Sequence, residues 1–479
     1  MTLLRVLGER EVGRIHEHAL HVLAETGLLI HDDEVVTRLT EAGALVHHEN
    51  GRRRVTIPSQ VVEDGLGEAP KVVTLYNRMG EEAMVLGSGR LHARSSSGAT
   101  AMLDQDGGQR RKATRQDAAH AVRLADSLSN VHGVSTMAVQ PADVPASTVD
   151  VHTVRLALAN TAKPLGYVCL NEGLIEAVVA MVAVVAGGEK RLRDRPMITA
   201  LAESTSPLQL VSSQLSVLKA FASRRLPLTL HAHPIAGLTA PVTLAGELVI
   251  THAEVLGLMT IAQLIGPGTP VVYGMSSSVP DMRNAANLSG AVEIGLLGVA
   301  VSQLARHCGV PCVVSSGSDA HQPGAQSVME RLMTLLPPAL AGVGLINLST
   351  LETKMSFSLE QLVIDDAIVG MVQRFLRGIA VEGETLALDL IKRVGPAGSF
   401  VAEEHTFEYY RDELLTCELI EHQPREAWQA AGAPDLESRA GEKVERLLAE
   451  HQPSPLPSSV VAELDDIVDA VEDEGGSPW

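Results

Sequence analysis

Polar and aromatic side chains recur at the ends of short apolar runs in this 479-residue chain. If the runs are parallel strands of an α/β fold, their carboxyl ends share one edge, where a site can form. Position alone does not separate a residue that does chemistry from a solvated loop residue. The candidates at these ends are Tyr167, Glu203, His231, His233, Tyr273, Ser315, Asp319, Asn347, Glu352 and Phe357.

His231 and His233 suggest the most specific chemistry. Residues i and i+2 of a strand face the same side, so two imidazoles here could ligate zinc. A metal-dependent hydrolase would need further ligands on other strands, for which Asp319 is a candidate. The simpler interpretation is a polar rim above a barrel core, and we expect no tightly bound metal.

Two lysines could form a Schiff base with a carbonyl substrate, as barrel aldolases do. Lys163 precedes a strand and lies at its wrong end, whereas Lys354 lies just past a strand end. Most lysines in such places are solvated, so neither is assigned this role.

Eight apolar runs alternate with Ala/Leu/Val-rich helical patterns, which predicts a TIM (β/α)8 barrel over residues 93–355. An open doubly wound sheet is the alternative, but no glycine-rich nucleotide-binding motif follows a strand. The first run could instead form a lid hairpin, because DQDGGQRR after it is typical of a turn. The runs are 95–103, 133–139, 164–170, 196–203, 227–234, 270–277, 311–318 and 344–350.

The flanking segments have other patterns. Residues 1–92 combine two amphipathic helices, short strands and a third helix, which predicts an N-terminal helical and β cap. Residues 356–451 predict a C-terminal helical extension, and 452–479 a linker followed by a solvated acidic tail helix.

Composition limits the possible partners. The formal net charge of -20 disfavours nucleic acid, and we identify neither a signal peptide nor a membrane span. The four cysteines form no CxxC pair, which disfavours a disulfide framework and a structural zinc site. We therefore expect a cytoplasmic protein.

Several segments in order resemble the trimethylamine methyltransferase family. They begin with ALHVLAETGLLIHDDEVVTRLTEAGALV and continue with SSGATAMLDQDGGQRRKATRQDAAHAVRLAD. The most specific block is GLTAPVTLAGELVITHAEVLGLMTIAQLIGPGTPVVYG, and SDAHQPGAQSVMERL and LETKMSFSLEQLVIDDAIVGMVQRFLRGI follow it. The resemblance covers roughly residues 15–412.

The resemblance implies a barrel enzyme that passes a methyl group to cob(I)alamin carried by a separate corrinoid protein. Trimethylamine-specific members contain pyrrolysine, which would lie in or near residues 345–357, and this sequence contains only the ordinary twenty residues. The chain is similar instead to the branch without pyrrolysine, whose substrates are quaternary amines such as glycine betaine. Related methylamine methyltransferases also lead us to expect a homo-oligomer.

A quaternary amine suits this chemistry because its leaving group is a neutral tertiary amine, so no general acid is needed. The enzyme has to align the reacting atoms and exclude water, and alignment alone can contribute up to about 7–11 kcal/mol. The twelve aromatic residues leave little material for a methylammonium cage.

We therefore predict a mixed substrate site. Glu203 and Glu352 are the catalytic candidates that supply negative charge, and Tyr273 or Phe357 packs on the methyl groups. His231, His233 or the Ser315–Ser318 hydroxyls would donate to a betaine carboxylate. Tyr167, Asp319 and Asn347 complete the predicted substrate-binding set.

Two alternative functions stay open. One is the metal-dependent hydrolase built on His231 and His233. The other is a non-catalytic member of the family that binds a methylammonium compound or a corrinoid protein.

Overall fold

Eight parallel strands form one closed barrel. The computed structural model describes residues 3–49, 51–104, 108–348, 350–473 and 475. A bridge between Arg94 and Gly133 joins the first strand to the second and closes the ring. The TIM-barrel prediction is therefore confirmed. The barrel strands are β6 (His92–Ser95), β9 (Val134–Ser135), β10 (Leu165–Tyr167), β11 (Ile198–Glu203), β13 (Leu228–Ala232), β14 (Val271–Met275), β17 (Cys312–Ser315) and β18 (Leu345–Leu348).

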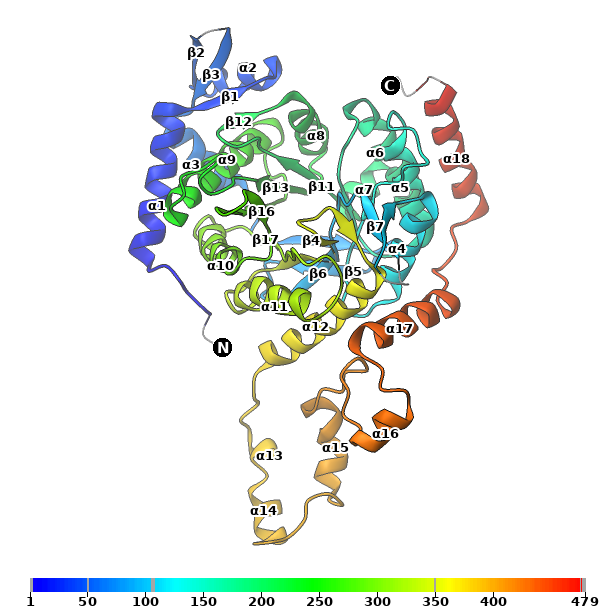
Figure 1. The fold of residues 1–479 in the computed structure, drawn as a ribbon. Helices are drawn as coiled ribbons and strands as arrows, with labels where there is room; N and C mark the ends of the chain where they lie inside the picture. The colour runs from blue at the N-terminus through cyan, green and yellow to red at the C-terminus, as the bar shows by residue number, and fades with distance from the viewer. Residues whose placement is uncertain (1–2, 50, 105–107, 349, 474, 476–479) are drawn as a thin grey trace.

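Helices follow the strands and surround the barrel (Figure 1). Because these helices cover the outer face and side chains fill the inner one, strands such as β13 and β14 are buried along their whole length. The surrounding helices are α4 (Arg115–Ser127), α5 (Val149–Asn160), α6 (Ile175–Ala186), α7 (Glu189–Asp194), α8 (Ser212–Ser223), α9 (Leu244–Ile265), α10 (Val292–His307), α11 (Ala325–Leu340) and α12 (Leu359–Arg377). A short 3-10 turn, η2 (Glu172–Leu174), precedes α6.

Helix α9 is the one helix among the described residues that is long and apolar enough to cross a membrane. In the fold, 78% of its most apolar window is buried. It packs against α3 (Ser59–Glu68) and α1 (Glu9–His21) on one side and the barrel strands β13 and β14 on the other. Its apolarity is therefore explained by its place between the barrel and the N-terminal cap.

The first strand prediction was only partly right. The barrel strand β6 ends at Ser95, where the predicted strand begins, and the apolar residues that follow lie in a separate sheet above the barrel. That sheet, called the lid sheet below, supports the alternative of a lid hairpin. Residues 105–107 of the predicted turn lie outside the described residues. The lid sheet contains β7 (Ala101–Leu103), β8 (Arg110–Lys112), β19 (Thr350–Leu351) and β20 (Ser356–Phe357).

A hairpin closes the opposite, N-terminal end of the barrel. Strands β4 (Val73–Tyr76) and β5 (Glu82–Leu86) pair antiparallel, and their apolar side chains enter the barrel end. These form a cluster with residues from β14, β17 and β18. The cluster consists of Val73, Leu75, Met84, Leu86, Val272, Val313 and Leu345.

The rest of the N-terminal cap packs on one side of the barrel. Its strand β1 extends a small sheet by pairing with β12 (Gln209–Leu210), which leads into α8. The cap elements are α1 (Glu9–His21), a π-helical turn η1 (Val22–Thr26), β1 (Leu28–Ile30), α2 (Asp33–Glu41), β2 (Leu45–Glu49), β3 (Arg52–Thr56) and α3 (Ser59–Glu68). A further hairpin, β15 (Val279–Asp281) with β16 (Ala286–Leu288), follows β14.

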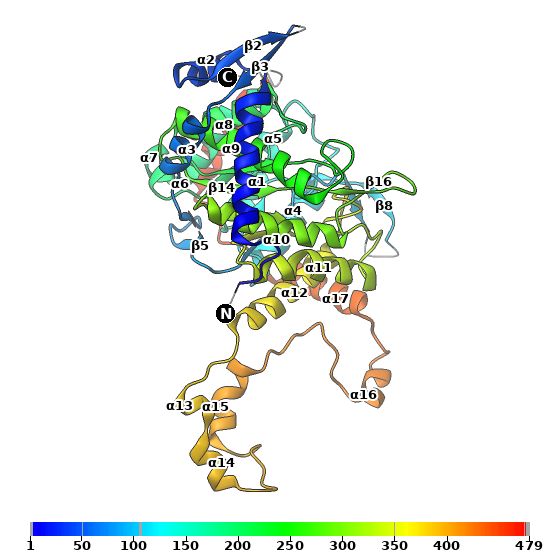
Figure 2. The same cartoon turned by 90° about the vertical axis from the view of Figure 1, so that its left-hand side faces the viewer.

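The C-terminal helices divide into two groups. Helices α13 (Gly383–Leu386), α14 (Leu388–Val394), α15 (Glu404–Glu413) and α16 (Arg425–Ala430) extend away from the barrel in both views (Figures 1 and 2). Helix α17 (Leu436–Glu450) returns to pack on α12 and α4.

The last helix differs from the solvated tail helix that the acidic sequence predicted. Helix α18 (Ser458–Asp473) packs against α5 and α6. Its buried residues Leu464, Val468 and Val471 are spaced along one helical face. The acidic residues occupy the other faces of the helix. The prediction of a solvated helix was wrong because it considered the number of acidic residues and not their spacing.

Candidate active site

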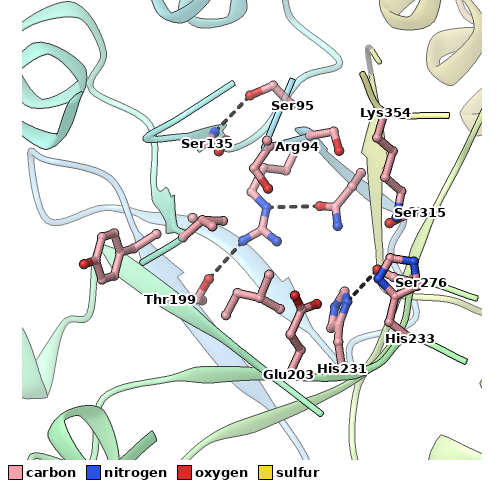
Figure 3. Close-up of a pocket in the computed structure, with 18 of the residues that line it drawn as sticks. Arg94, Ser95, Ser135, Thr199, Glu203, His231, His233, Ser276, Ser315 and Lys354 are labelled. Carbon is pink, nitrogen blue, oxygen red and sulfur yellow. Dashed lines mark hydrogen bonds between the residues drawn. The ribbon is translucent and has the colours of Figure 1, made fainter. Parts of the chain in front are cut away.

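A polar cavity of about 290 Å³ lies at the carboxyl ends of the barrel strands, below the lid sheet. Side chains from most of the barrel strands line it, and the chain after β18 supplies the remainder. Figure 3 shows how these groups converge on one space. The lining includes Arg94, Ser135, Tyr167, Thr199, Leu201, Glu203, His231, His233, Ser276, Ser315, Asn347, Lys354 and Met355.

Arg94 lies at the centre of the cavity floor, although it comes from the first strand. Its Nε donates to Oδ1 of Asn347 (3.1 Å) and its Nη1 to Oγ1 of Thr199 (2.9 Å). Burial lowers the pKa of Arg94 to about 10, so it stays a cation at neutral pH. The two bonds use two of its five N–H donors, which leaves donors for a ligand.

Gly166 makes room for this arginine. A Cβ atom at position 166 would lie 2.5 Å from Nη1 of Arg94, which is far inside contact distance. A glycine inside a strand often marks such a close approach.

His231 and His233 both line the cavity, as predicted from their i, i+2 spacing. His231 Nδ1 lies 2.9 Å from the Ser276 hydroxyl, and its buried Nε2 has no hydrogen-bond partner among the described residues. Burial, with the charges of Lys354 and Arg94 next in size, holds the pKa of His231 well below its usual value. Burial and Lys354 also lower the pKa of His233 to about 4. Both rings are therefore neutral at physiological pH.

Glu203 and Lys354, an acidic and a basic group, share the cavity without forming an ion pair. Burial raises the pKa of Glu203, and Lys354 partly offsets this. Burial lowers the pKa of Lys354, and Glu203 partly offsets that. No described residue lies within ion-pair distance of either group, so both are available to a charged ligand.

A strained turn delivers Lys354 to the cavity. Glu352, Thr353 and Lys354 have φ angles of 50°, 55° and 72°, a left-handed conformation that costs free energy in non-glycine residues. The Thr353 hydroxyl lies 2.8 Å from both Asp319 Oδ1 and the Asn287 carbonyl oxygen, and it shares its single proton between these two acceptors. These bonds hold the turn in place.

Two predicted site residues support this turn and do not line the cavity. Asp319 accepts from the backbone N–H groups of Ser289 and Gly290 as well as from Thr353. Glu352 bonds His321 (2.8 Å) and Ser356. The structure therefore places Asp319 and Glu352 behind the cavity wall, where they position Lys354.

The three predicted aromatic contacts also point elsewhere. The Tyr167 hydroxyl donates to Asp150 (2.9 Å) on the helix side of the barrel. Tyr273 lies outside the cavity lining, with its hydroxyl 2.9 Å from Nδ1 of His252. Phe357 is fully buried in the lid sheet. Of these three residues, Tyr167 alone is among the residues that line the cavity, and its hydroxyl is committed to Asp150.

Three metal-ligand side chains meet at a place away from His231 and His233, the pair considered in the hydrolase alternative. His16, His252 and Cys308 bring their ligand atoms within 4.8 Å of one another, outside the barrel. Here His16 contacts His252 (2.9 Å) and Glu63 (2.8 Å), which continues a hydrogen-bonded chain from Tyr273. Among the described residues, His231 and His233 have no third ligand at comparable spacing. The donor set therefore does not fit the hydrolase alternative.

Comparison with known proteins identifies the family of this chain. A family model described as trimethylamine methyltransferase matches residues 1–476. The chain belongs to the trimethylamine methyltransferase family. The predicted resemblance is thus confirmed over almost the whole chain, and methyl transfer is the activity that the family is named for.

Members of the family with different substrates are similar to this chain. A trimethylamine methyltransferase of Desulfitobacterium hafniense (strain DSM 10664 / DCB-2) is 35% identical over 471 residues, which is 98% of this chain and 94% of the relative. A glycine betaine methyltransferase of D. hafniense strain Y51 is 30% identical over 462 residues, covering 96% and 95%. The monomethylamine methyltransferase of Methanosarcina barkeri is similar in structure, with a TM-score of 0.47 and 11% identity over 91% of this chain and 92% of that one.

Three cavity residues were absent from the set of site residues predicted from sequence. The prediction from sequence missed Arg94, Thr199 and Ser135. Arg94 was missed because the predicted first strand began one residue after it. Arg94 could have been recognised as a candidate because it is a basic residue next to an apolar run, in a segment that is buried in the structure.

Proposed function

We propose that this protein removes a methyl group from a quaternary amine that also carries a carboxylate, a betaine, and passes it to the corrinoid of a separate protein. The observation that carries the proposal is the charge pattern of the cavity. Two unpaired cationic groups, Arg94 and Lys354, share it with the carboxyl group of Glu203. A small zwitterion complements this pattern.

The two cations favour a betaine over a simple amine. Trimethylamine is a cation at neutral pH and offers nothing to Arg94 and Lys354. A carboxylate would accept charge-assisted hydrogen bonds from both, which contribute about 1.5–3 kcal/mol each. Neutral His231 and His233 and the Ser276 and Ser315 hydroxyls can complete its hydrogen bonds.

The ammonium end would lie toward Glu203. Glu203 supplies the opposite charge, while Leu201 and Met355 supply apolar contact for methyl groups. This assignment differs from the aromatic cage, for which the cavity has too few rings. Glu203 moves no proton, because the departing tertiary amine is neutral and needs none. Its task is to hold the nitrogen so that one methyl group faces the open end of the barrel.

The size of the cavity supports a methyl acceptor that is carried by a separate protein. The cavity volume of about 290 Å³ suits a small molecule and is far too small to enclose a corrinoid. When bound above the mouth, the reduced corrinoid supplies the nucleophile for the methyl carbon. The residues of this chain bind and orient the amine and exclude water, which is how alignment accelerates the transfer. The four free cysteines accord with a reducing, cytoplasmic setting.

The decisive experiment follows methylcobalamin formation in the visible spectrum. The purified protein is mixed with chemically reduced cobalamin and one of three amines, namely glycine betaine, choline or trimethylamine. We expect methyl transfer from the betaine. Choline has the same ammonium group without the carboxylate and should react at least tenfold more slowly at equal concentration.

A variant separates the role of the carboxylate from general damage. Lys354→Met should weaken turnover of the betaine about tenfold and leave the weak reaction with choline unchanged. Equal rates with choline and betaine, or transfer from trimethylamine alone, would refute the proposed substrate class. No transfer from any amine, with binding of the betaine intact by calorimetry, would favour the non-catalytic alternative.

A further inference from the structure

Two histidines and a cysteine from three different helices meet between the N-terminal cap and the barrel. His16 lies on α1, His252 lies on α9, and Cys308 directly follows the last residue of α10. Figure 2 shows α1 along the side of the barrel, and α9 and α10 pack against it. One ligand atom from each residue, two ring nitrogens and the thiol sulfur, lie within 4.8 Å of one another. These three residues are called the histidine–cysteine cluster below.

The histidines of the cluster lie where polar side chains are uncommon. His252 is fully buried in the apolar helix α9, and His16 is 7% exposed. Burial, with His16 and His307 next in size, holds the pKa of His252 well below its usual value, so its ring is neutral. A neutral imidazole is the form that ligates a metal.

The outer nitrogen of each ring already has the kind of partner that a ligating histidine uses. His252 Nδ1 lies 2.9 Å from the Tyr273 hydroxyl, and His16 Nε2 lies 2.8 Å from Oε1 of Glu63. Such partners fix the orientation of the ring and direct its other nitrogen toward the metal. The two inner nitrogens, Nε2 of His252 and Nδ1 of His16, face each other at 2.9 Å in the cluster with Cys308.

A chain of hydrogen bonds would by itself satisfy the four ring nitrogens, but it gives no role to Cys308. This cysteine is free, and burial, with Glu63 next in size, raises the pKa of its thiol to about 12. The thiol therefore ionises only when a cation binds beside it. Its position at the C-terminal end of α10 favours a cation, because the helix dipole is negative there.

We propose that the histidine–cysteine cluster binds one zinc ion, which joins the N-terminal cap to the barrel. Two imidazole nitrogens and a thiolate form a mixed donor set that suits zinc and not magnesium or calcium. Around one zinc ion such atoms lie about 3–4 Å apart. The spacing in the structure therefore requires only small side-chain movements.

Binding exchanges one proton for the ion. The Cys308 thiol releases its proton to solvent, and the sulfur ligates zinc as the thiolate. The Glu63 carboxylate keeps a proton on Nε2 of His16, so the proton between the two inner nitrogens belongs to His252. That proton moves to Nδ1 of His252, which then donates to the Tyr273 oxygen, and both inner nitrogens can ligate.

The fourth ligand would come from the exposed edge of the cluster. The Glu63 side chain is 46% exposed, and the exposed His307 ring lies 4.8 Å from the His16 ring, measured between their centroids. Either side chain, or a water molecule, can complete a tetrahedral site there. The same edge gives the ion its route of entry.

No sequence pattern indicates this site, because its ligands are far apart along the chain. His16 and His252 are separated by 236 residues, and Cys308 belongs to no CxxC pair. The expectation of no tightly bound metal rested on His231 and His233, which are a different pair. The fold alone brings the three ligands together.

Metal analysis of the purified full-length protein tests the proposal. Protein produced in zinc-supplemented medium and dialysed against metal-free buffer should retain about one zinc ion per chain. Cobalt(II) in place of zinc should give a cobalt–thiolate charge-transfer band in the near ultraviolet, which reports a cysteine ligand. Removing the ion with a chelator should lower the midpoint of thermal unfolding by about 2–4 °C, and added zinc should restore it.

Variants on two different helices identify the ligands. Cys308→Ser should abolish the cobalt–thiolate band, and both Cys308→Ser and His16→Gln should weaken zinc binding by at least about tenfold. The unfolding midpoint of either variant should no longer respond to the chelator, and circular dichroism shows whether each is folded. Cys417→Ser, at a partly exposed free cysteine, and His233→Gln, in the barrel cavity, are controls that should bind zinc as the wild type does.

Each of three results would overturn the proposal. A protein that holds no zinc and whose unfolding midpoint responds to neither zinc nor cobalt would show that the cluster is a hydrogen-bonded chain only. Zinc retained by both Cys308→Ser and His16→Gln would place the ion elsewhere. Zinc lost from His233→Gln, with the protein folded, would place the ion at the mouth of the barrel.

Discussion

Glu203 is the residue whose charge the proposed substrate needs most. Replacing it by glutamine keeps the shape of the side chain and removes its negative charge. We expect Glu203→Gln to weaken binding of glycine betaine about tenfold, which is about 1.4 kcal/mol, because the ammonium group loses its counter-charge. Isothermal titration calorimetry measures this directly. Affinity equal to that of the wild type would remove Glu203 from the site.

Gly274 is as important as any polar residue of the cavity, although it has no side chain. A Cβ there would lie 1.9 Å from Cδ2 of His231, so the ring would have to swing away from Ser276. We expect Gly274→Ala to reduce kcat/KM at least tenfold and to destabilise the fold by about 1–3 kcal/mol through overpacking.

Gly13 offers the matched control for that substitution. It lies within α1, and a Cβ there would meet nothing within 4 Å. Gly13→Ala should leave activity unchanged and raise the midpoint of thermal unfolding slightly, because alanine is the better helix former. Equal behaviour of the two variants would show that Gly274 has no special role.

Among the structural elements, the turn of residues 352–354 matters most for substrate binding, because it positions Lys354 in the cavity. Thr353→Val removes both hydroxyl bonds that fix it and keeps a side chain of similar volume. We expect KM for the betaine to rise about tenfold and the free energy of unfolding to fall by about 1–2 kcal/mol. Thr353→Ser keeps a hydroxyl and should restore most of the affinity. A serine variant as impaired as the valine variant would refute this role of the hydroxyl.

The barrel strands could be predicted from sequence because they are buried on both faces and appear as continuous apolar runs. For the same reason, the sequence does not indicate which side chains of these strands point into the barrel. Tyr273 and Gly274 are neighbours on β14 and both are buried. Side chains alternate along the strand, so Val272 and Gly274 face the barrel interior and Tyr273 faces the surrounding helices. An amphipathic strand would have revealed this alternation, but these strands have no polar face. The prediction for Tyr273 was wrong for this reason, whereas Tyr167 does lie among the residues that line the cavity.

Other parts of the site depend on contacts between distant segments. Asp319 and Glu352 were recognised as polar residues near strand ends, but their role behind the Lys354 turn follows from hydrogen bonds to Ser289, His321 and other segments. No local pattern encodes such pairings. The glycines at 166 and 274 were the unused signal, since glycine in a buried strand marks a close approach.

For the whole molecule, several buried histidines make stability depend on pH. Burial lowers the pKa of His132 and of His233 to about 4, against a value of about 6.5 in the unfolded chain. The unfolded state therefore binds more protons between these values, and the free energy of unfolding falls as the pH drops from about 6.5 toward 4.

Urea unfolding at pH 7 and pH 5 checks this dependence. We expect a lower midpoint at pH 5, and His132→Gln should reduce the difference between the two pH values. His18→Gln, at an exposed histidine of α1, is the control. A midpoint that does not change over this interval would contradict the expectation.

The hairpin of β4 and β5 that fills the lower end of the barrel has a kinetic consequence. With that end closed, the amine must enter and its demethylated product must leave through the same opening that the methyl acceptor covers. The proposed reaction would therefore follow a compulsory order, in which the amine binds first and the acceptor second. The acceptor must also depart before the amine product is released, so a high concentration of acceptor protein should slow turnover by trapping the product.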